Sequence, residues 1–199
     1  MLPLMPDLFA LKVPVFWAEG QPTIPSDGYA LSIGGLVACP LEIGPDELQR
    51  LATDTVDCRL TSVTRWSVRV AWRGMLALRL VDMVRPAAEA RFAKLTSFGG
   101  VYTTTVALSD LAHPRAVFAV AANGAVLPVE YGGPVRAVFP HLWGYKSAKS
   151  LVAIEFVAAS EAGYWETRGY ADDASITASK LFDLNTRTTR GHQGGEVTW

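Results

Sequence analysis

The chain has 199 residues, of which 50% are hydrophobic and 19% are charged, so it has enough apolar material for one buried core and is not a disordered chain. Its formal net charge of -1 excludes the overall basic field that gathers nucleic acid or an anionic membrane surface. The two cysteines, Cys39 and Cys58, form neither a zinc-binding pattern nor a disulfide framework, which favours a reducing compartment.

Residues 1–28 contain five prolines, which predicts an extended N-terminal arm. The arm lacks the basic start and the unbroken apolar stretch of a signal peptide. No apolar run in the chain approaches the ~20 residues of a membrane helix. We therefore expect a cytoplasmic protein with no membrane span and no nucleic-acid partner.

The central part of the chain, residues 29–170, is predicted to be one strand-rich domain. Alternation of apolar and polar residues predicts strands over residues 29–37 and 56–60. A proline followed by two acidic residues at positions 45–47 predicts a short helix through Leu51. Residues 75–84 form an amphipathic pattern that stops before Pro86, which predicts a second helix.

Further along, strands are predicted over residues 91–97 and 151–158, and residues 117–121 and 125–129 flank Asn123-Gly124, a strong hairpin signal. Residues 171–199 turn polar and predict an extended or loosely ordered C-terminal tail. Strands joined by short helices favour an α+β fold over a doubly wound sheet.

One segment, residues 131–149, concentrates the polar chemistry of the chain. Common phosphate-loop, dinucleotide and hydrolase motifs are missing elsewhere. Within this segment, cations and a serine lie among Phe139, Trp143 and Tyr145, which suits a phosphorylated, planar heteroaromatic ligand. The polar members are Arg136, His141, Lys146, Ser147 and Lys149. A surface loop with solvated lysines and buried aromatic residues is the alternative.

The order of several motifs resembles the molybdopterin-binding domain of sulfite-oxidase-type oxidoreductases, in particular the small bacterial members without a haem domain. The motifs are LSIGGLV at residues 31–37, SVTRWS at 62–67 with WRG at 72–74, YTTTVAL at 102–108, NGAVLP at 123–128, GGPVRAVFPHLWGYKSAKS at 132–150 and GYWETRGY at 163–170. The resemblance implies that family's fold, a mixed strand-rich domain with short helices.

The resemblance also implies roles for individual residues. Lys146, Ser147 and Lys149 would contact the phosphate of the pterin cofactor, and Arg136 and His141 lie in the same cofactor-facing stretch.

Two residues are implied at the substrate. Arg65 would face the pterin or an oxyanion, and Tyr102 corresponds to a tyrosine near the substrate. Purely structural roles remain the alternative for both: Arg65 as the partner of a carboxylate, and Tyr102 as a buried phenol.

The family's molybdenum-binding cysteine corresponds to Ser62 in this chain. A thiolate is a soft ligand that is available near neutral pH, whereas a serine hydroxyl is harder and must be deprotonated by the metal. Cys58 lies four residues upstream, roughly 13 Å along an extended strand, and is expected to be a buried thiol. Other departures from the family pattern occur at Thr105, Ala107, Tyr131 and Ser150.

Three functions remain open from the sequence. The first is a molybdopterin-dependent oxidoreductase that transfers an oxygen atom on a small oxyanion or sulfoxide, with a separate electron-transfer partner. The second is a catalytically degenerate member that binds an anionic or pterin-like small molecule without molybdenum redox chemistry, since position 62 holds a serine. The third is a partner-binding scaffold with an empty pocket.

Overall fold

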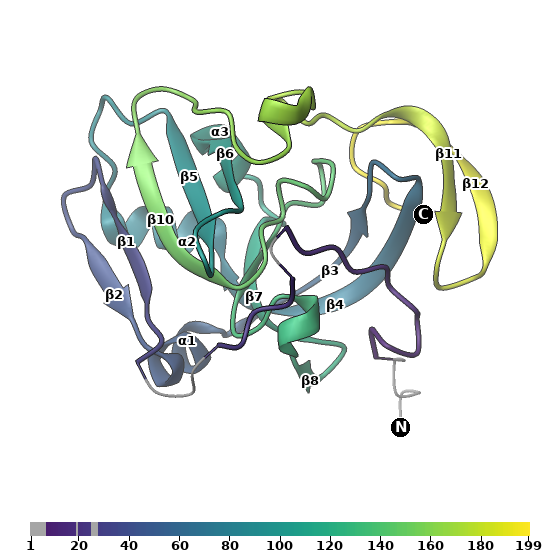
Figure 1. Ribbon diagram of the computed structural model, residues 1–199, viewed down its shortest axis with the longest axis horizontal. Helices are drawn as coiled ribbons and strands as arrows, with labels where there is room; N and C mark the ends of the chain where they lie inside the picture. Colours follow the sequence, from purple (N-terminus) through teal and green to yellow (C-terminus); the bar gives the residue numbers. More distant parts are fainter. Residues whose placement is uncertain (1–6, 19, 25–27) are drawn as a thin grey trace.

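The protein, seen in a computed structural model that describes residues 7–18, 20–24 and 28–199, is built on two sheets (Figure 1). The five-stranded sheet has the order β2 (Leu41–Ile43), β1 (Leu31–Gly35), β10 (Leu151–Val157), β5 (Phe92–Ser97) and β6 (Thr103–Ala107). β1 pairs in parallel with β10, while the other neighbours are antiparallel. A parallel pair needs a long connection, and most of the second sheet is inserted between these two strands.

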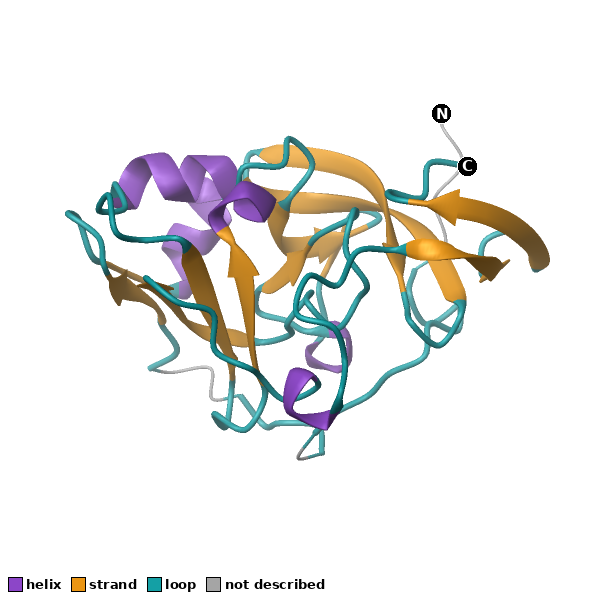
Figure 2. Ribbon diagram, turned by 90° about the horizontal axis from the view of Figure 1, so that it is seen from above, coloured by secondary structure: helices purple, strands orange, loops and turns teal. Residues whose placement is uncertain are grey.

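The second sheet has seven strands. Its path is β12 (Thr188–Gly194), β11 (Thr177–Asp183), β4 (Trp66–Leu76), β7 (Val117–Ala122) and β8 (Ala125–Val126), with β3 (Asp54–Thr61) on β4 and β9 (Arg136–Val138) on β7. Figure 2 shows the helices α1 (Pro45–Leu51), α2 (Ala77–Val84) and α3 (Leu108–Leu111) at the end of the molecule away from β11 and β12. No helix within the described residues is long and apolar enough to cross a membrane.

β7 separates the two parts of the hydrophobic core. Phe118 and Val120 pack in a cluster with the five-stranded sheet and the helices, whereas Val117 and Ala119 pack in a second cluster with β3, β4 and the N-terminal arm. Every residue of β7 is buried. Burial of both faces explains why this strand reads as a continuous apolar run rather than an alternating one.

The structure confirms the main predicted strands, the helix ending at Leu51 and the hairpin at Asn123-Gly124. The long strand β4 was not predicted, and it continues to Leu76, so that helix α2 begins at Ala77 rather than at residue 75. The described part of the N-terminal arm contains no helix or strand, and residues 1–6, 19 and 25–27 of that predicted arm lie outside the described residues.

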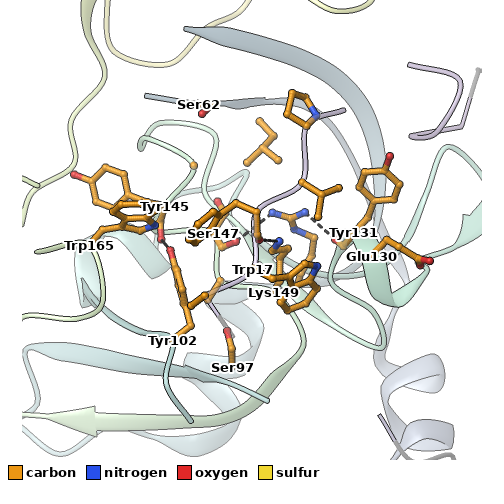
Figure 3. A pocket seen from close by; sticks show the side chains of 18 of the residues that line it. Trp17, Ser62, Ser97, Tyr102, Glu130, Tyr131, Tyr145, Ser147, Lys149 and Trp165 are labelled. Carbon is orange, nitrogen blue, oxygen red and sulfur yellow. Dashed lines mark hydrogen bonds between the residues drawn. The ribbon is translucent and has the colours of Figure 1, made fainter. Parts of the chain in front are cut away.

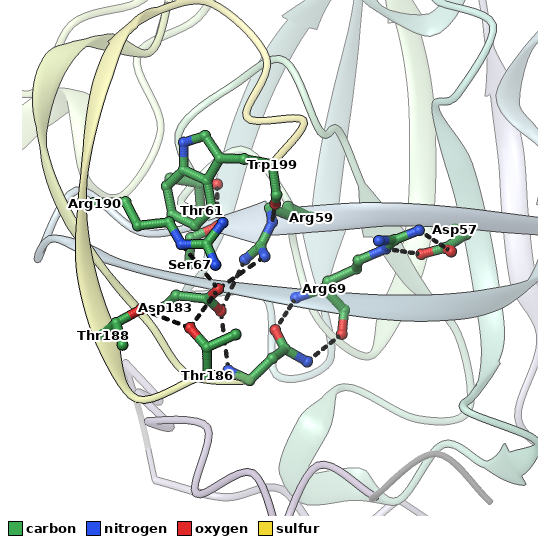
Figure 4. Close-up of polar contacts among 11 residues, drawn as sticks. Asp57, Arg59, Thr61, Ser67, Arg69, Asp183, Thr186, Thr188, Arg190 and Trp199 are labelled. Carbon is green, nitrogen blue, oxygen red and sulfur yellow. Dashed lines mark hydrogen bonds and ion pairs between the residues drawn. The ribbon is translucent and has the colours of Figure 1, made fainter. Parts of the chain in front are cut away.

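The C-terminal segment differs from the expected loose tail, because β11 and β12 form a hairpin at the edge of the seven-stranded sheet. A buried ion pair attaches it to β3 (Figure 4). The Arg59 guanidinium donates two hydrogen bonds of 3.1 Å to the Asp183 carboxylate. Thr186 donates a further hydrogen bond of 2.9 Å to Asp183, and the Trp199 ring stacks 4.4 Å from the guanidinium. These contacts between distant residues carry no local sequence signal.

Gly74 provides a test of the close packing between β4 and β7. A Cβ atom at this position would lie 2.0 Å from the carbonyl oxygen of Phe118, at the point where the β4–β7 register shifts. We expect Gly74→Ala to lower the free energy of unfolding by about 1–3 kcal/mol, because backbone must move to accept the methyl group. Gly34→Ala is the control, since a Cβ there meets nothing within 4 Å. Equal losses in urea denaturation would contradict the close approach.

Candidate functional site

A cavity of about 510 Å³ lies between the two sheets and the N-terminal arm (Figure 3). Five parts of the chain line it: the arm, the turn between β3 and β4, the loop between β5 and β6, residues 130–149, and the segment that carries Trp165 and Tyr170. Of the residues that sequence analysis assigned to a site, the cavity brings together Ser62, Tyr102, Arg136, Ser147 and Lys149.

One end of the cavity holds two cations. The buried guanidinium of Arg136 donates to the backbone oxygens of Tyr131 at 2.8 Å and Ser147 at 3.1 Å. Burial lowers the pKa of Arg136 to about 10. The ammonium group of Lys149 donates to the backbone oxygen of Phe16. Burial, together with the nearby charge of Arg136, lowers the pKa of Lys149 to about 7.

Neither cation forms an ion pair with a carboxylate in the described chain. Glu130 is the one carboxylate among the described lining residues, and it is paired with neither of them. Buried charge without a counter-ion is costly, so the arrangement favours an anionic ligand at this end.

Two neutral donors lie at the same cavity. The Ser147 hydroxyl accepts a hydrogen bond of 3.1 Å from the Phe139 backbone, which leaves its own proton available. The indole nitrogen of Trp17 is buried and has no hydrogen-bond partner within the described residues. Trp17 lies against Lys149, with the ammonium 3.9 Å from a ring centroid. Both groups could donate to oxygen atoms of a bound anion.

Aromatic side chains form another wall of the cavity. Trp165 and Tyr170 stack at a centroid distance of 4.8 Å, and Tyr145 packs edge-on against Tyr170 at 5.1 Å. Phe16 of the arm lies 5.0 Å from Trp165. Flat apolar surfaces beside a cationic end suit a ligand with a planar ring system and a negatively charged group.

Ser62 lies at the cavity in the turn between β3 and β4, well apart from Lys149 (Figure 3). The Ser62 hydroxyl is 2.8 Å from the Thr64 hydroxyl, and its oxygen accepts a hydrogen bond of 3.2 Å from the Thr64 backbone. Cys58 is buried in β3 outside the cavity lining, where burial raises the pKa of its thiol to about 12. Ser62 therefore faces the cavity and Cys58 does not.

Arg65 and Tyr102 occupy different surroundings. Arg65 has a left-handed backbone with φ of 72°, is exposed, and places its guanidinium 5.6 Å from the Trp143 ring rather than in the cavity lining. Tyr102 lines the cavity and donates a hydrogen bond of 2.5 Å to the backbone oxygen of Tyr145. Burial raises the pKa of the Tyr102 phenol, so it stays a neutral donor at physiological pH.

The structure does not bring Lys146 and His141 to the cavity lining. Lys146 is buried in an ion pair of 2.5 Å with Glu166 and donates to the Thr105 backbone oxygen at 2.7 Å. His141 lies 3.1 Å from Asp110 and stacks on another imidazole. Both residues belong to an irregular loop, where the direction of a side chain follows no sequence period.

The described residues contain no group of three or more histidine, cysteine or acidic side chains arranged to hold a metal.

Sequence reasoning missed the contributions of the arm and of segment 163–170. Phe16, Trp17, Trp165 and Tyr170 all line the cavity, but no role was predicted for them. The pairing of Glu166 with Lys146 was also missed. The available signals were the adjacent aromatic residues Phe16 and Trp17 in the arm and the GYWETRGY motif at residues 163–170, but a single sequence does not show which of these side chains line a cavity.

Comparison with known proteins identifies the class of protein to which the chain belongs. The family model of the oxidoreductase molybdopterin binding domain matches residues 18–165. The chain therefore belongs to this family, which is the sulfite-oxidase-type family that the motifs resemble.

Several relatives extend this finding. The uncharacterized oxidoreductase YuiH of Bacillus subtilis is 33% identical over 141 residues, covering 70% of this chain and 71% of the relative. The chain is also similar to two protein-methionine-sulfoxide reductase catalytic subunits, MsrP. The Campylobacter jejuni subunit is 27% identical, covering 71% of this chain and 53% of the relative. The Ralstonia nicotianae subunit is 31% identical, covering 65% and 44%.

Among solved structures, the sulfane dehydrogenase SoxCD from Paracoccus pantotrophus aligns with a TM-score of 0.67 and 16% identity, covering 88% of this chain and 47% of that one. This likeness confirms the strand-rich α+β fold. The chain spans about half the length of both MsrP relatives and of the sulfane dehydrogenase chain.

The pKa of Lys149 predicts how anion binding responds to pH. Lysine is charged below its pKa, so an anion gains this counter-charge below about pH 7 and loses it above. Sulfate is a suitable probe because its own charge is constant over this range. We expect sulfate affinity, measured by calorimetry, to weaken up to about tenfold per pH unit above pH 7. Lys149→Arg should remove this dependence, and the same pH dependence in Lys149→Met would contradict the assignment.

The Lys146–Glu166 pair predicts a loss of stability when one partner is neutralised. Glu166→Gln would leave the buried ammonium of Lys146 without its counter-charge, which costs about 3–5 kcal/mol of unfolding free energy. The matched control is Glu161→Gln, because the Lys94–Glu161 pair is much more exposed, with side-chain exposures of 29% and 57%. This control should lose less than about 1 kcal/mol in urea denaturation. Similar losses in both variants would contradict a buried pair.

Proposed function

We propose that the cavity binds a molybdopterin cofactor and that the protein is an oxidoreductase acting on a sulfoxide. The observation that carries the proposal is a pair of cations at the cavity, the buried Arg136 and the half-buried Lys149, that lack a carboxylate partner in the described chain. Because the chain belongs to a family of molybdopterin-binding domains, the phosphate of the cofactor would supply the missing negative charge.

The residues around the cavity fit the parts of this cofactor. Lys149, Ser147 and the Trp17 indole would hold the phosphate, while the guanidinium of Arg136 stabilises its charge from the buried side. The stacked aromatic wall would cover the pterin ring. Ser62 would face the metal, and the neutral phenol of Tyr102, held by its hydrogen bond to the Tyr145 backbone oxygen, would lie beside the substrate. Bound molybdenum would supply the two-electron chemistry of oxygen-atom transfer.

The surroundings of Ser62 favour a sulfoxide over an oxyanion as substrate. The adjacent lining residues are Leu60, Val63, Thr64 and Trp66, which carry no charge. Arg65, the cation nearest in sequence, lies outside the lining. A neutral sulfoxide does not need a counter-charge, whereas an oxyanion does. Two MsrP relatives are named as protein-methionine-sulfoxide reductases, which supports the same substrate class.

The reaction would consume a sulfoxide, two electrons and two protons and would yield a thioether and water. We propose that the electrons come from a separate electron-transfer partner.

A second function is a cofactor-binding member without metal redox chemistry. It is favoured by the Ser62 hydroxyl, which already interacts with the hydroxyl and the backbone of Thr64 within its own turn. A serine oxygen held in this way must give up these contacts and its proton to become a metal ligand.

Metal and pterin content separate the two functions. The chain, Ser62→Cys and Ser62→Ala would be purified from a host that makes the cofactor, and molybdenum would be measured by mass spectrometry and pterin by fluorescence after oxidation. We expect about one pterin and one molybdenum per wild-type chain, with reduction of a methionine sulfoxide by a reduced viologen dye. Pterin without molybdenum, and molybdenum only in Ser62→Cys, supports the second function. If no protein contains pterin, both fail.

A further inference from the structure

Residues 13–18 of the N-terminal arm, here called the strap, cross the cationic end of the cavity. All six line the cavity, and Trp17 lies beside Lys149 in Figure 3. The arm before the strap is firmly anchored by Leu8 and Leu11, and the strap's first residue, Val13, is buried in the same core cluster, which contains β3 and β4. The exposed residues Pro14, Val15 and Phe16 follow directly.

Few polar contacts hold the strap beyond Val13. Within the described chain, the backbone of residues 14–18 makes one hydrogen bond, which the Phe16 oxygen accepts from Lys149. The Trp17 ring adds a cation–π contact with the same ammonium group. A segment with so few backbone hydrogen bonds opens at a low free-energy cost.

Beyond Val13, Phe16 makes the strap's contacts with aromatic rings across the cavity. Its ring lies 5.0 Å from Trp165 and 6.1 Å from Tyr164, in a tilted arrangement. The Phe16 side chain is nevertheless 47% exposed, so only part of it is buried by these contacts. Phe16 therefore fastens the strap to segment 163–170 across the cavity, through a contact that can form and break.

We propose that the strap is a gate that closes the cationic end of the cavity over its anionic ligand, with Phe16 as the latch and Lys149 as the group it covers. The ligand's identity rests on the function proposed above. Entry and release of the ligand require Phe16 to leave Trp165 and Tyr164. When the ligand is bound, the closed strap brings the unpaired Trp17 indole to its oxygen atoms.

The ionisation of Lys149 in the ligand-free protein measures closure. Trace acetylation over a range of pH, quantified for each lysine by mass spectrometry, gives the pKa of Lys149 with the exposed Lys180 as internal reference. A closed strap excludes water and keeps the pKa of Lys149 near 7. We expect Phe16→Ala to raise this pKa by more than about one unit towards the ordinary lysine value.

Matched variants separate the latch from a general loss of structure. Phe182→Ala truncates another partly exposed phenylalanine, on β11 and outside the cavity lining, and should leave the pKa of Lys149 unchanged. Phe16→Tyr keeps the ring and should behave like the wild type. An ordinary lysine pKa in the wild type, or the same low pKa in Phe16→Ala, would overturn the proposal.

Ligand retention gives a second readout. Protein purified with bound pterin would be transferred into cofactor-free buffer, and pterin loss would be followed with time. We expect release to be about tenfold faster from Phe16→Ala than from the wild type or Phe182→Ala. Equal release rates would overturn the gate while leaving the cofactor assignment intact. If no pterin is bound, the function proposed above fails, and the Lys149 titration still decides whether the strap closes.

Discussion

The hydrogen bonds of the Arg136 guanidinium determine much of the site. They join the start of β9 to the backbone oxygen of Tyr131, which precedes this strand, and to that of Ser147, in the loop after it that carries Lys149. Because carbonyl oxygens satisfy the donors without cancelling the charge, the positive potential remains available to the cavity. A carboxylate in place of these carbonyl oxygens would also bind the guanidinium, but it would cancel the positive charge that attracts an anion.

Much of the fold could be predicted from local patterns. Alternation located β1 and β3, strands were also predicted at the positions of β5 and β10, and Asn123-Gly124 located the hairpin between β7 and β8. The C-terminal hairpin could not be predicted, because its strands are mostly polar and exposed and are held by the distant pair of Arg59 and Asp183 and by the single buried apolar residue of β11, Leu181. Tertiary contacts override local composition at such an edge.

The sequence predicted which types of residue the site contains, but not which of them face the cavity. The segment around residues 136–149 contains both cavity residues and core residues, and Lys146 and Lys149 differ by only three positions. One is neutralised by Glu166, and the other faces the cavity. Nothing in the spacing distinguishes them, because the partner is twenty residues away on another segment. The position of the arm over the cavity could not be predicted either, because an irregular segment has no hydrophobic period that indicates which part of the protein it contacts.

The C-terminal hairpin has a consequence for the opposite end of the cavity. The backbone of Phe182 donates a hydrogen bond of 2.9 Å to the oxygen of Arg65, and Leu184 donates one of 2.9 Å to Ser67. The end of β11 and the residue after it thus hold the β4 side of the turn that begins at Ser62. Tags, fusions or truncations at the C-terminus would consequently act on the geometry of Ser62, more than a hundred residues earlier in the chain, while sparing the cationic end. The Ser62 end and the cationic end of the cavity are therefore held in place by different parts of the chain.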